Sequence, residues 1–259
     1  MDTQAQADAL TFEAYEALSQ RERALRGLAF HGDLDDQLTE DRVKARELCY
    51  AYNHHPWQPY FPGYTFADQF GPESRQQHLA DLFHLPLERV KQLALEPPIA
   101  FDYGYNTTFK GEFYANTGCV FLDGAAITFG ERVVLAPGVH IYCGTHSVDV
   151  EERRAAYDRA YPVTVGDDVW IGGGAKILGG TVIGDGCTVA AGAVVKGTFP
   201  PHSVIAGVPA RVIRTLDPPA PFNRETGEGV AKPDDERLRR PLRGMEGRAS
   251  VPLEGAEKA

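Results

Sequence analysis

The sequence lacks several features that define broad classes of protein. It has no apolar run long enough to cross a bilayer, and its first 18 residues lack the basic flank and apolar stretch of a signal peptide. Its formal net charge is -10, so we expect neither nucleic acid nor a membrane as partner. Four widely spaced cysteines show no paired metal-site spacing. We therefore expect a cytoplasmic protein with reduced thiols and no bound metal.

The composition divides the chain into three regions. Hydrophobic residues make up 43% of the sequence, which is enough for a sizeable core. We interpret residues 1–96 as an N-terminal helical region and residues 97–216 as a β domain rich in Gly, Val and Ile. Residues 217–259 carry prolines and many charges but few large apolar side chains, so we expect a disordered tail.

The N-terminal region has the periodicity of helices. Apolar residues three and four positions apart predict helices over 13–27 and 38–53, and a further helix over 73–84. We expect the second of these to start near Thr39, which two acidic residues follow. The stretch 54–72 is rich in aromatic residues, and Pro56, Pro59 and Pro62 interrupt it, so it cannot form a continuous helix.

The β domain repeats with a period of six. One aliphatic position recurs at Val165, Ile171, Ile177, Ile183, Val189 and Val195, and keeps its phase upstream at Phe129, Leu135 and Ile141. Two residues before it, small or β-branched residues recur at Val163, Val169, Ala175, Thr181, Cys187 and Ala193. Gly or Ala often follows it, at Gly166, Gly172, Gly184 and Ala190.

This period matches neither a helix nor an ordinary strand, but it suits a solenoid. Each hexad would form one flat face and one tight turn, and three hexads would close a triangular coil. The aliphatic residues would point inward and stack about 4.8 Å apart. We expect the glycines to adopt backbone angles that a Cβ forbids. The alternative is a Gly-rich antiparallel β domain, which six hexads in phase make improbable.

One segment, residues 143–161, breaks the repeat. It is polar and charged, and it contains a histidine. We interpret it as a loop extruded from the solenoid, and loops on rigid scaffolds often carry function.

The motifs ANTG, LAPGVHIY and VWIGG, together with the loop histidine, resemble maltose O-acetyltransferase and galactoside O-acetyltransferase. The resemblance covers roughly residues 20–55 and 97–216. It implies a mainly β, left-handed parallel β-helix with an N-terminal α-helical region and an extruded loop. It further implies a homotrimer with active sites at the subunit interfaces, acetyl-CoA as the donor, and a hydroxyl acceptor that is usually a sugar.

The chain departs from that family at four places. The stretch 54–85 is longer, and the tail after Leu216 is additional. The family often has a Thr-Lys pair after its last hexad, whereas here Lys196 comes one residue early and Gly197 follows. The galactoside enzyme has a second Asp after the residue that matches Asp123, but here the next residue is Gly124.

Acetyl transfer to a hydroxyl needs a base, because a sugar hydroxyl is not ionised at neutral pH. A histidine can accept this proton, and His146 stands at the start of the extruded loop in the position the family uses. The simpler interpretation of His146 is a surface loop residue. Backbone N–H groups of Gly172, Gly173 or Gly174 could hold the oxyanion, although the same glycines also suit turn geometry.

The resemblance also suggests residues for acceptor binding. It assigns Asp33, Asp102 and Asn116 to the acceptor, since carboxylates and amides bind vicinal hydroxyls. Asp123 is a further candidate for an acceptor contact. It is equally well interpreted as a corner residue that caps backbone N–H groups.

A second set of residues is expected at the donor site. An outward Trp170 on a coil suggests a contact with a ligand or a neighbouring subunit, and the family has it beside the pantetheine arm. Gly173, three residues after Trp170, is expected at the same donor site. The phosphates of coenzyme A would meet a basic cluster formed by Lys196, Arg211 and Arg214, for which solvated surface charge is the alternative.

Three alternatives, of which the first is another mechanism and two are other functions, compete with direct acetyl transfer by His146. Cys143 lies three residues before it, so a Cys–His pair could form an acyl-enzyme. His140 lies six residues before it, and histidines on adjacent coils hold zinc in β-helical carbonic anhydrases. No third ligand is evident, and a catalytic zinc needs three. A non-catalytic β-helix scaffold is the remaining rival. Among enzymes, acceptors other than sugars, such as an antibiotic or an oligosaccharide, stay open.

Overall fold

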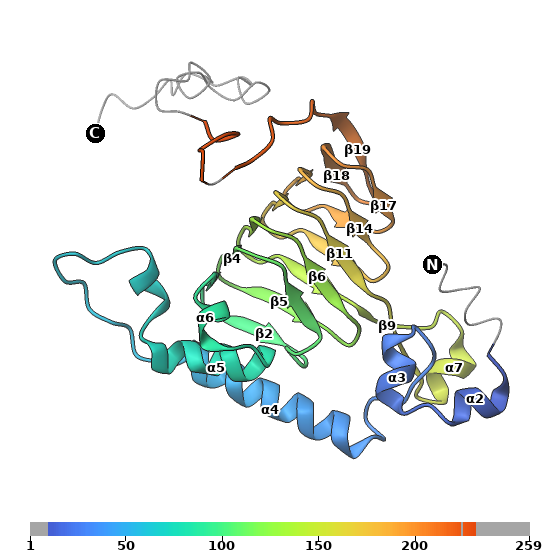
Figure 1. Cartoon of the computed structure of the whole chain (residues 1–259). Coiled ribbons are helices and arrows are strands. Elements are labelled where there is room, and N and C mark those ends of the chain that lie inside the picture. Colours follow the sequence, from blue (N-terminus) through green and yellow to red (C-terminus); the bar gives the residue numbers. More distant parts are fainter. Residues whose placement is uncertain (1–9, 224, 232–259) are drawn as a thin grey trace, which may run out of the picture. The chain divides into compact units, whose positions relative to one another are not determined.

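A computed structural model describes residues 10–223 and 225–231 of the chain (Figure 1). The chain divides after Leu216 into two units, residues 1–216 and 217–259. The described residues of the second unit contain an isolated bridge between Asn223 and Glu228 but no helix or longer strand. Most of the tail for which the sequence predicts disorder lies outside the described residues.

Helices dominate the N-terminal region. They are α2 (Phe12–Glu16), α3 (Gln20–Leu25), α4 (Asp36–Asn53), the 3₁₀ helix η1 (Ala67–Phe70), α5 (Glu73–Phe83) and α6 (Leu87–Val90). No helix within the described residues is long and apolar enough to span a membrane.

Two helix boundaries differ from those predicted. The segment 13–27 holds two helices, because Ser19 caps the second of them. Its hydroxyl accepts the N–H of Glu22, whose carboxylate accepts the N–H of Ser19 in return. The predicted start of the long helix at Thr39 is wrong, since α4 begins at Asp36. Asp35 caps this helix, because its side chain can accept a backbone N–H of the first turn. Thr39 lies inside the helix and cannot take this role.

Residues 93–215 form three sheets that run along a solenoid. Sheet 1 contains β1 (Leu93–Leu95), β4 (Phe113–Ala115), β7 (Val133–Leu135), β12 (Trp170–Ile171), β15 (Thr188–Val189), β18 (Ser203–Gly207) and β19 (Ala210–Thr215). Sheet 2 contains β2 (Ile99–Phe101), β5 (Cys119–Leu122), β8 (His140–Tyr142), β13 (Lys176–Leu178) and β16 (Val194–Val195). Sheet 3 contains β3 (Thr107–Phe109), β6 (Ile127–Phe129), β11 (Val163–Val165), β14 (Val182–Ile183) and β17 (Thr198–Phe199).

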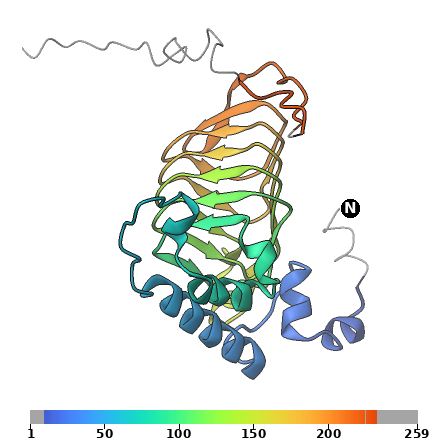
Figure 2. The same ribbon diagram turned by 60° about the vertical axis from the view of Figure 1, so that its left-hand side comes forward.

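The hexads form the predicted triangular coils, stacked one above another (Figure 2). Strands within each sheet are parallel, apart from the final pair β18 and β19. Ile171 pairs with Val189, 18 residues and therefore three hexads later. All six aliphatic positions and all six small positions of the regular hexads are buried. The fold is thus mainly β, a left-handed parallel β-helix with N-terminal helices, as the sequence predicted.

The corner glycines are required for a different reason than expected. Gly166 and Gly172 do not have positive φ values. Instead, a Cβ on Gly172 would lie 2.6 Å from the backbone nitrogen of Ala191 and 2.8 Å from the carbonyl oxygen of Val189, in the next coil. These glycines therefore permit the close approach of neighbouring coils. The positive φ values occur at another corner position, as in Gly174 and its equivalents.

Aromatic residues and helices close the N-terminal end of the solenoid. Phe83, at the end of α5, contacts Phe101 and Phe109 edge to face, with ring centroids 5.1 and 5.0 Å apart. Phe101 stacks on Phe121 in the next coil. The helices thereby cover an inner surface that the first coil would otherwise expose.

The extruded loop is a β-hairpin with a helical turn. It consists of β9 (Gly144–His146), α7 (Val150–Arg154) and β10 (Asp158–Ala160), and it leaves the corner between sheets 2 and 3. Its two ends meet, because the N–H of Tyr161 donates to the carbonyl of Cys143 at 3.0 Å. The β-helix therefore resumes in register beyond it, with Val163 paired to Ile127.

Candidate active site

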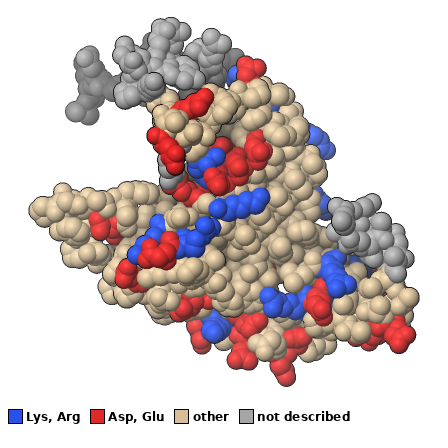
Figure 3. All heavy atoms as spheres, in the orientation of Figure 1, with Lys and Arg blue, Asp and Glu red and all other residues tan. Residues whose placement is uncertain are grey.

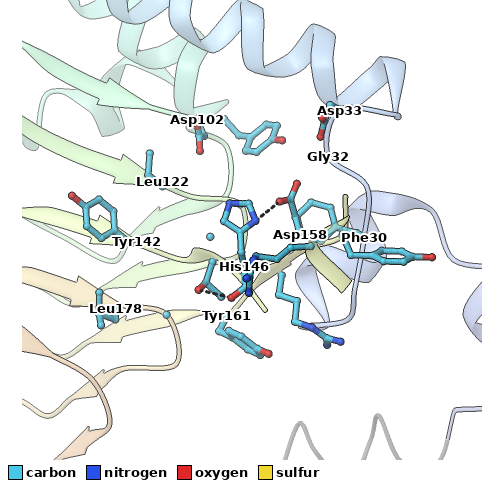
Figure 4. Close-up of a pocket in the computed structure, with 18 of the residues that line it drawn as sticks. Phe30, Gly32, Asp33, Asp102, Leu122, Tyr142, His146, Asp158, Tyr161 and Leu178 are labelled. Atoms are coloured by element: carbon cyan, nitrogen blue, oxygen red, sulfur yellow. Dashed lines mark hydrogen bonds and ion pairs between the residues drawn. The ribbon is translucent and has the colours of Figure 1, made fainter. Parts of the chain in front are cut away.

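His146 lies at the end of β9, where the hairpin leaves the β-helix (Figure 4). Its side chain is 69% exposed, and its Nδ1 lies 3.1 Å from Oδ1 of Asp158. The two residues are paired across the antiparallel hairpin, so the backbone register itself brings them together. An N–H at Nδ1 that donates to Asp158 leaves Nε2 as the free acceptor.

The N-terminal segment fixes Asp158. Phe30 and Asp158 exchange two backbone hydrogen bonds of 3.1 and 2.8 Å. Beside them, the ring of His31 stacks on Tyr157, with centroids 4.1 Å apart. Sequence reasoning missed Asp158, because its position opposite His146 depends on the hairpin register and on a bridge to a segment more than 120 residues away.

A cavity of about 970 Å³ lies between this hairpin, the coils and the N-terminal region. Its lining includes four of the predicted site residues, His146, Asp33, Asp102 and Lys196. Figure 4 shows the side chains of Asp33 and Asp102 beyond His146, on the side of the N-terminal segment and the first coils. The volume lies within the range of small-molecule sites.

Asp102 is held by a residue that the sequence did not single out. The Nε of Arg42, in α4, donates to Oδ1 of Asp102 at 2.9 Å. Arg42 also lines the cavity, which adds a cation to a wall that already carries carboxylates. The signal for Arg42 was weak, since it looks like one charge among many on an exposed helix. By contrast, the exposed Asp33 has no hydrogen-bond or ion-pair partner within the described residues, and it lines the cavity.

Five other predicted residues lie on sheet 1 or directly after one of its strands, and they do not line this cavity. Trp170 is 51% exposed on β12, and Gly173 follows in the next turn. Asn116 follows β4 in the same sheet, and its side-chain oxygen accepts the N–H of Thr117. Two of the three basic residues of the donor set, Arg211 and Arg214, lie exposed on β19, whereas Lys196 lines the cavity. One copy of the chain therefore presents two separate groups of candidate residues.

The glycine run after Trp170 contains one amide that is free to bind a ligand. The N–H groups of Gly172 and Gly174 donate to the carbonyls of Val189 and Pro137 at 2.8 and 2.9 Å. These two are therefore unsuitable for an oxyanion. The N–H of Gly173 has no hydrogen-bond partner within the described part of the chain.

Asp123 is a structural residue in this chain. It is fully buried, and its Oδ1 accepts the N–H of Tyr103 at 2.8 Å. Its other oxygen accepts the hydroxyl of Thr107 at 3.2 Å. With no exposed surface, the carboxylate cannot contact an acceptor directly. The geometry thus matches the corner-capping interpretation of Asp123, and not that of a substrate ligand.

Burial raises the pKa of Asp123 to about 6, from an ordinary value of 3.8. The folded state therefore favours the neutral carboxyl, and this stabilisation is lost as the pH rises through about 6. As the pH rises from about 4 to about 7, we expect the stability of Asp123→Asn, whose side chain stays neutral, to increase relative to that of the native chain. Urea unfolding of both proteins at both pH values measures this. A stability difference that does not change with pH would contradict the prediction.

The alternatives of covalent and metal catalysis find no support in the geometry. The thiol of Cys143 is buried, and burial raises its pKa to about 12, so it is not ionised near neutral pH. The Nδ1 of His140 contacts the hydroxyl of Tyr142. Among residues 10–223 and 225–231, no three His, Cys, Asp or Glu side chains come together as metal ligands.

Comparison with known proteins decides the family. Residues 23–84 match the maltose acetyltransferase hexapeptide capping motif, and residues 162–197 match the bacterial transferase hexapeptide with six repeats. A Schizosaccharomyces pombe protein named as an acetyltransferase is 36% identical over 189 residues, which are 71% of this chain and 86% of the relative. The structure of a maltose O-acetyltransferase from Clostridium difficile 630 is 35% identical, with a TM-score of 0.68, over 78% of this chain and 100% of that one.

This chain belongs to the hexapeptide-repeat maltose O-acetyltransferase family. A galactoside acetyltransferase of known structure, solved in complex with coenzyme A, is also similar. It is 30% identical, with a TM-score of 0.63, over 77% of this chain and 92% of that one. The capping motif of the family corresponds here to helices α3 to α5 and the aromatic stretch between them. The resemblance inferred from the sequence motifs is confirmed.

Proposed function

We propose that this acetyltransferase moves the acetyl group of acetyl-CoA to a hydroxyl of a sugar or a similar acceptor, with His146 as general base. The observation that carries the proposal is the pairing of His146 with Asp158 at the wall of the large cavity. A histidine that is oriented through one nitrogen can accept a proton at the other. The cavity offers space for a small acceptor beside it.

The proposed reaction is a direct transfer. Nε2 of His146 takes the acceptor's hydroxyl proton while the oxygen attacks the thioester carbonyl, and a tetrahedral intermediate forms. The N–H of Gly173 is the candidate to hydrogen-bond its oxyanion. The C–S bond then breaks, and the imidazolium returns the proton to the thiolate of coenzyme A. Asp158 keeps the ring oriented throughout and offsets its transient positive charge.

For the acceptor, we propose Asp33 and Asp102 as the hydroxyl-binding residues, with Arg42 holding Asp102 in place. A carboxylate that the bound acceptor covers rejects analogues that lack the matching hydroxyl, because the carboxylate would then stay unpaired. The exposed carboxylate of Asp33 is the better placed of the two for a direct contact.

For the donor, we propose that a second copy of the chain completes the site. Trp170 lies on sheet 1 and Gly173 in the turn that follows it, away from the His146 cavity of their own chain. Asn116, which is expected at the acceptor, follows β4 in the same sheet. A homotrimer that sets sheet 1 of one copy against the hairpin of the next would unite the two groups. Lys196, Arg211 and Arg214 would then meet the phosphates of coenzyme A. All three are exposed, and such cations are notable in a chain of net charge -10.

The test is an assay of thiol release from acetyl-CoA with a panel of acceptors. We expect purified protein to release free coenzyme A in the presence of sugars such as maltose or glucose. Release with an antibiotic or an oligosaccharide alone would keep the reaction but change the acceptor. No release with any acceptor, together with no binding of acetyl-CoA in calorimetry, would favour a non-catalytic scaffold.

A further inference from the structure

Tyr103, at the bend after β2, borders the His146 cavity and carries a hydroxyl without a protein partner. Only 9% of the residue is exposed, and it lines the cavity. Within the described residues its hydroxyl makes no hydrogen bond, yet the oxygen is not among the unpaired polar atoms that are fully cut off from solvent. The oxygen therefore keeps some accessible surface, and the cavity is the open space that this residue borders.

Other buried or half-buried tyrosines of the chain have partners for their hydroxyls. The hydroxyl of Tyr52 donates to the carbonyl of Leu95 at 2.5 Å. That of Tyr105 donates to Oδ2 of Asp41 at 2.7 Å. A buried tyrosine hydroxyl usually has such a partner. The exception at Tyr103 indicates that its partner belongs to a molecule that enters the cavity.

The backbone holds Tyr103 in this position before any ligand binds. Its N–H donates to Oδ1 of the buried Asp123 at 2.8 Å, and the N–H of Asp102 donates to the carbonyl of Phe121 at 3.1 Å. The chain bends here and does not continue as a strand, so the consecutive residues Asp102 and Tyr103 both line the cavity. A group that is already fixed loses little conformational freedom when it binds a ligand.

The hydroxyl of Tyr103 is a neutral group in charged surroundings. Basic and acidic side chains lie side by side on the outer surface around α3 and α4 (Figure 3), and inside the cavity Asp102 pairs with Arg42. Burial raises the pKa of Tyr103 to about 12, an effect that Arg42 opposes and Asp102 reinforces. The phenol therefore stays protonated near neutral pH, and it can both donate and accept a hydrogen bond.

We infer that Tyr103 is a specificity-determining residue, whose hydroxyl donates to a non-reacting hydroxyl of the acceptor that itself donates to a carboxylate of the cavity. The inference rests on the proposed function, since it takes the acceptor to be a sugar or a similar polyol. Ionised Asp33 and Asp102 can only accept hydrogen bonds. The Nε of Arg42 is already engaged by Asp102. Tyr103 therefore supplies a donor for the lone pairs that such a hydroxyl leaves free.

The experiment compares the native chain with Tyr103→Phe on methyl α-D-glucoside and its monodeoxy analogues, by thiol release from acetyl-CoA. The analogue without the reacting hydroxyl gives no product. For one of the other analogues, we expect the ratio of kcat/KM between parent and analogue to be about tenfold smaller in Tyr103→Phe than in the native chain. The reason is that the variant leaves no hydroxyl unpaired when this analogue binds. The ratios for the remaining analogues should stay native.

Tyr105→Phe is the matched control. It removes a hydroxyl that donates to Asp41, and Tyr105 does not line the cavity. We expect this control to lower stability in urea unfolding while every acceptor ratio stays native. Tyr103→Phe should show the opposite pattern, with native stability and one changed ratio, because its hydroxyl has no protein partner to lose.

Native ratios for every analogue in Tyr103→Phe would overturn the inference. So would a loss of kcat/KM shared equally by all acceptors, which a purely structural role would produce. If no glucoside is acetylated, the sugar acceptor of the proposed function fails, and calorimetric binding of methyl α-D-glucoside then decides on Tyr103 alone. Binding that Tyr103→Phe weakens supports the inference, whereas absent or unchanged binding overturns it.

Discussion

Replacing His146 by alanine is expected to lower kcat for acetyl transfer by about 10²–10⁴-fold, because the acceptor hydroxyl then loses its base. Stability should change little, since the side chain is 69% exposed and its only ion-pair or hydrogen-bond partner within the described residues is Asp158. The measurement is thiol release at saturating acetyl-CoA, with thermal unfolding of the same preparations.

The matched control is His54→Ala. This histidine is exposed near the end of α4, where it stacks on Tyr50, and it does not line the cavity. It should retain native activity. Asp158→Asn keeps the hairpin's backbone bridge but weakens the contact with the imidazole, so we expect a smaller loss than for His146→Ala. Native activity in His146→Ala would contradict the assignment of the base.

The second large effect is expected from Gly172→Ala. The added Cβ would lie 2.6 Å from the nitrogen of Ala191 and 2.8 Å from the carbonyl oxygen of Val189. Both contacts are with backbone of the next coil, which cannot turn away as a side chain would. We therefore expect a loss at or above the upper end of the range of about 1–3 kcal/mol for overpacking. Urea unfolding followed by circular dichroism measures it.

Gly144→Ala provides the control for this substitution. A Cβ on Gly144 would meet no atom within 4 Å, and its φ is not positive. Its stability should therefore stay close to native. Equal stability of the Gly172 and Gly144 variants would mean that the coils can separate locally, which would contradict the close packing inferred for this corner.

The regular part of the β-helix was predictable because it repeats. Each hexad position meets the same environment in every coil, so a single periodic pattern in the sequence identifies the inward row from Val165 to Val195. The loop at 143–161 was predictable as an interruption of this pattern. The reason for the glycine at position 172 was not predictable, because close approach between coils and a positive φ both favour glycine and look the same in the sequence.

A site residue was predictable from the sequence only where its own type and position were enough to suggest its role. His146, Asp33, Asp102 and Lys196, all named from the sequence, line one cavity. The partners of two of them, Asp158 and Arg42, were missed, since each depends on a long-range contact that leaves no periodic trace. For Asp123 the sequence left two interpretations open, because a carboxylate at a corner can face inward or outward. Its burial decides between them.

The hairpin that carries His146 begins and ends at the same corner, where Tyr161 bonds to Cys143. Its length is therefore independent of the length of a coil. Residues could be added or removed around α7 without shifting any strand of the β-helix. The hairpin is thus a natural place to vary acceptor choice, by evolution or by design, while the stack of coils stays the same. The limit on such changes is the contact with Phe30, which ties the hairpin to the N-terminal segment.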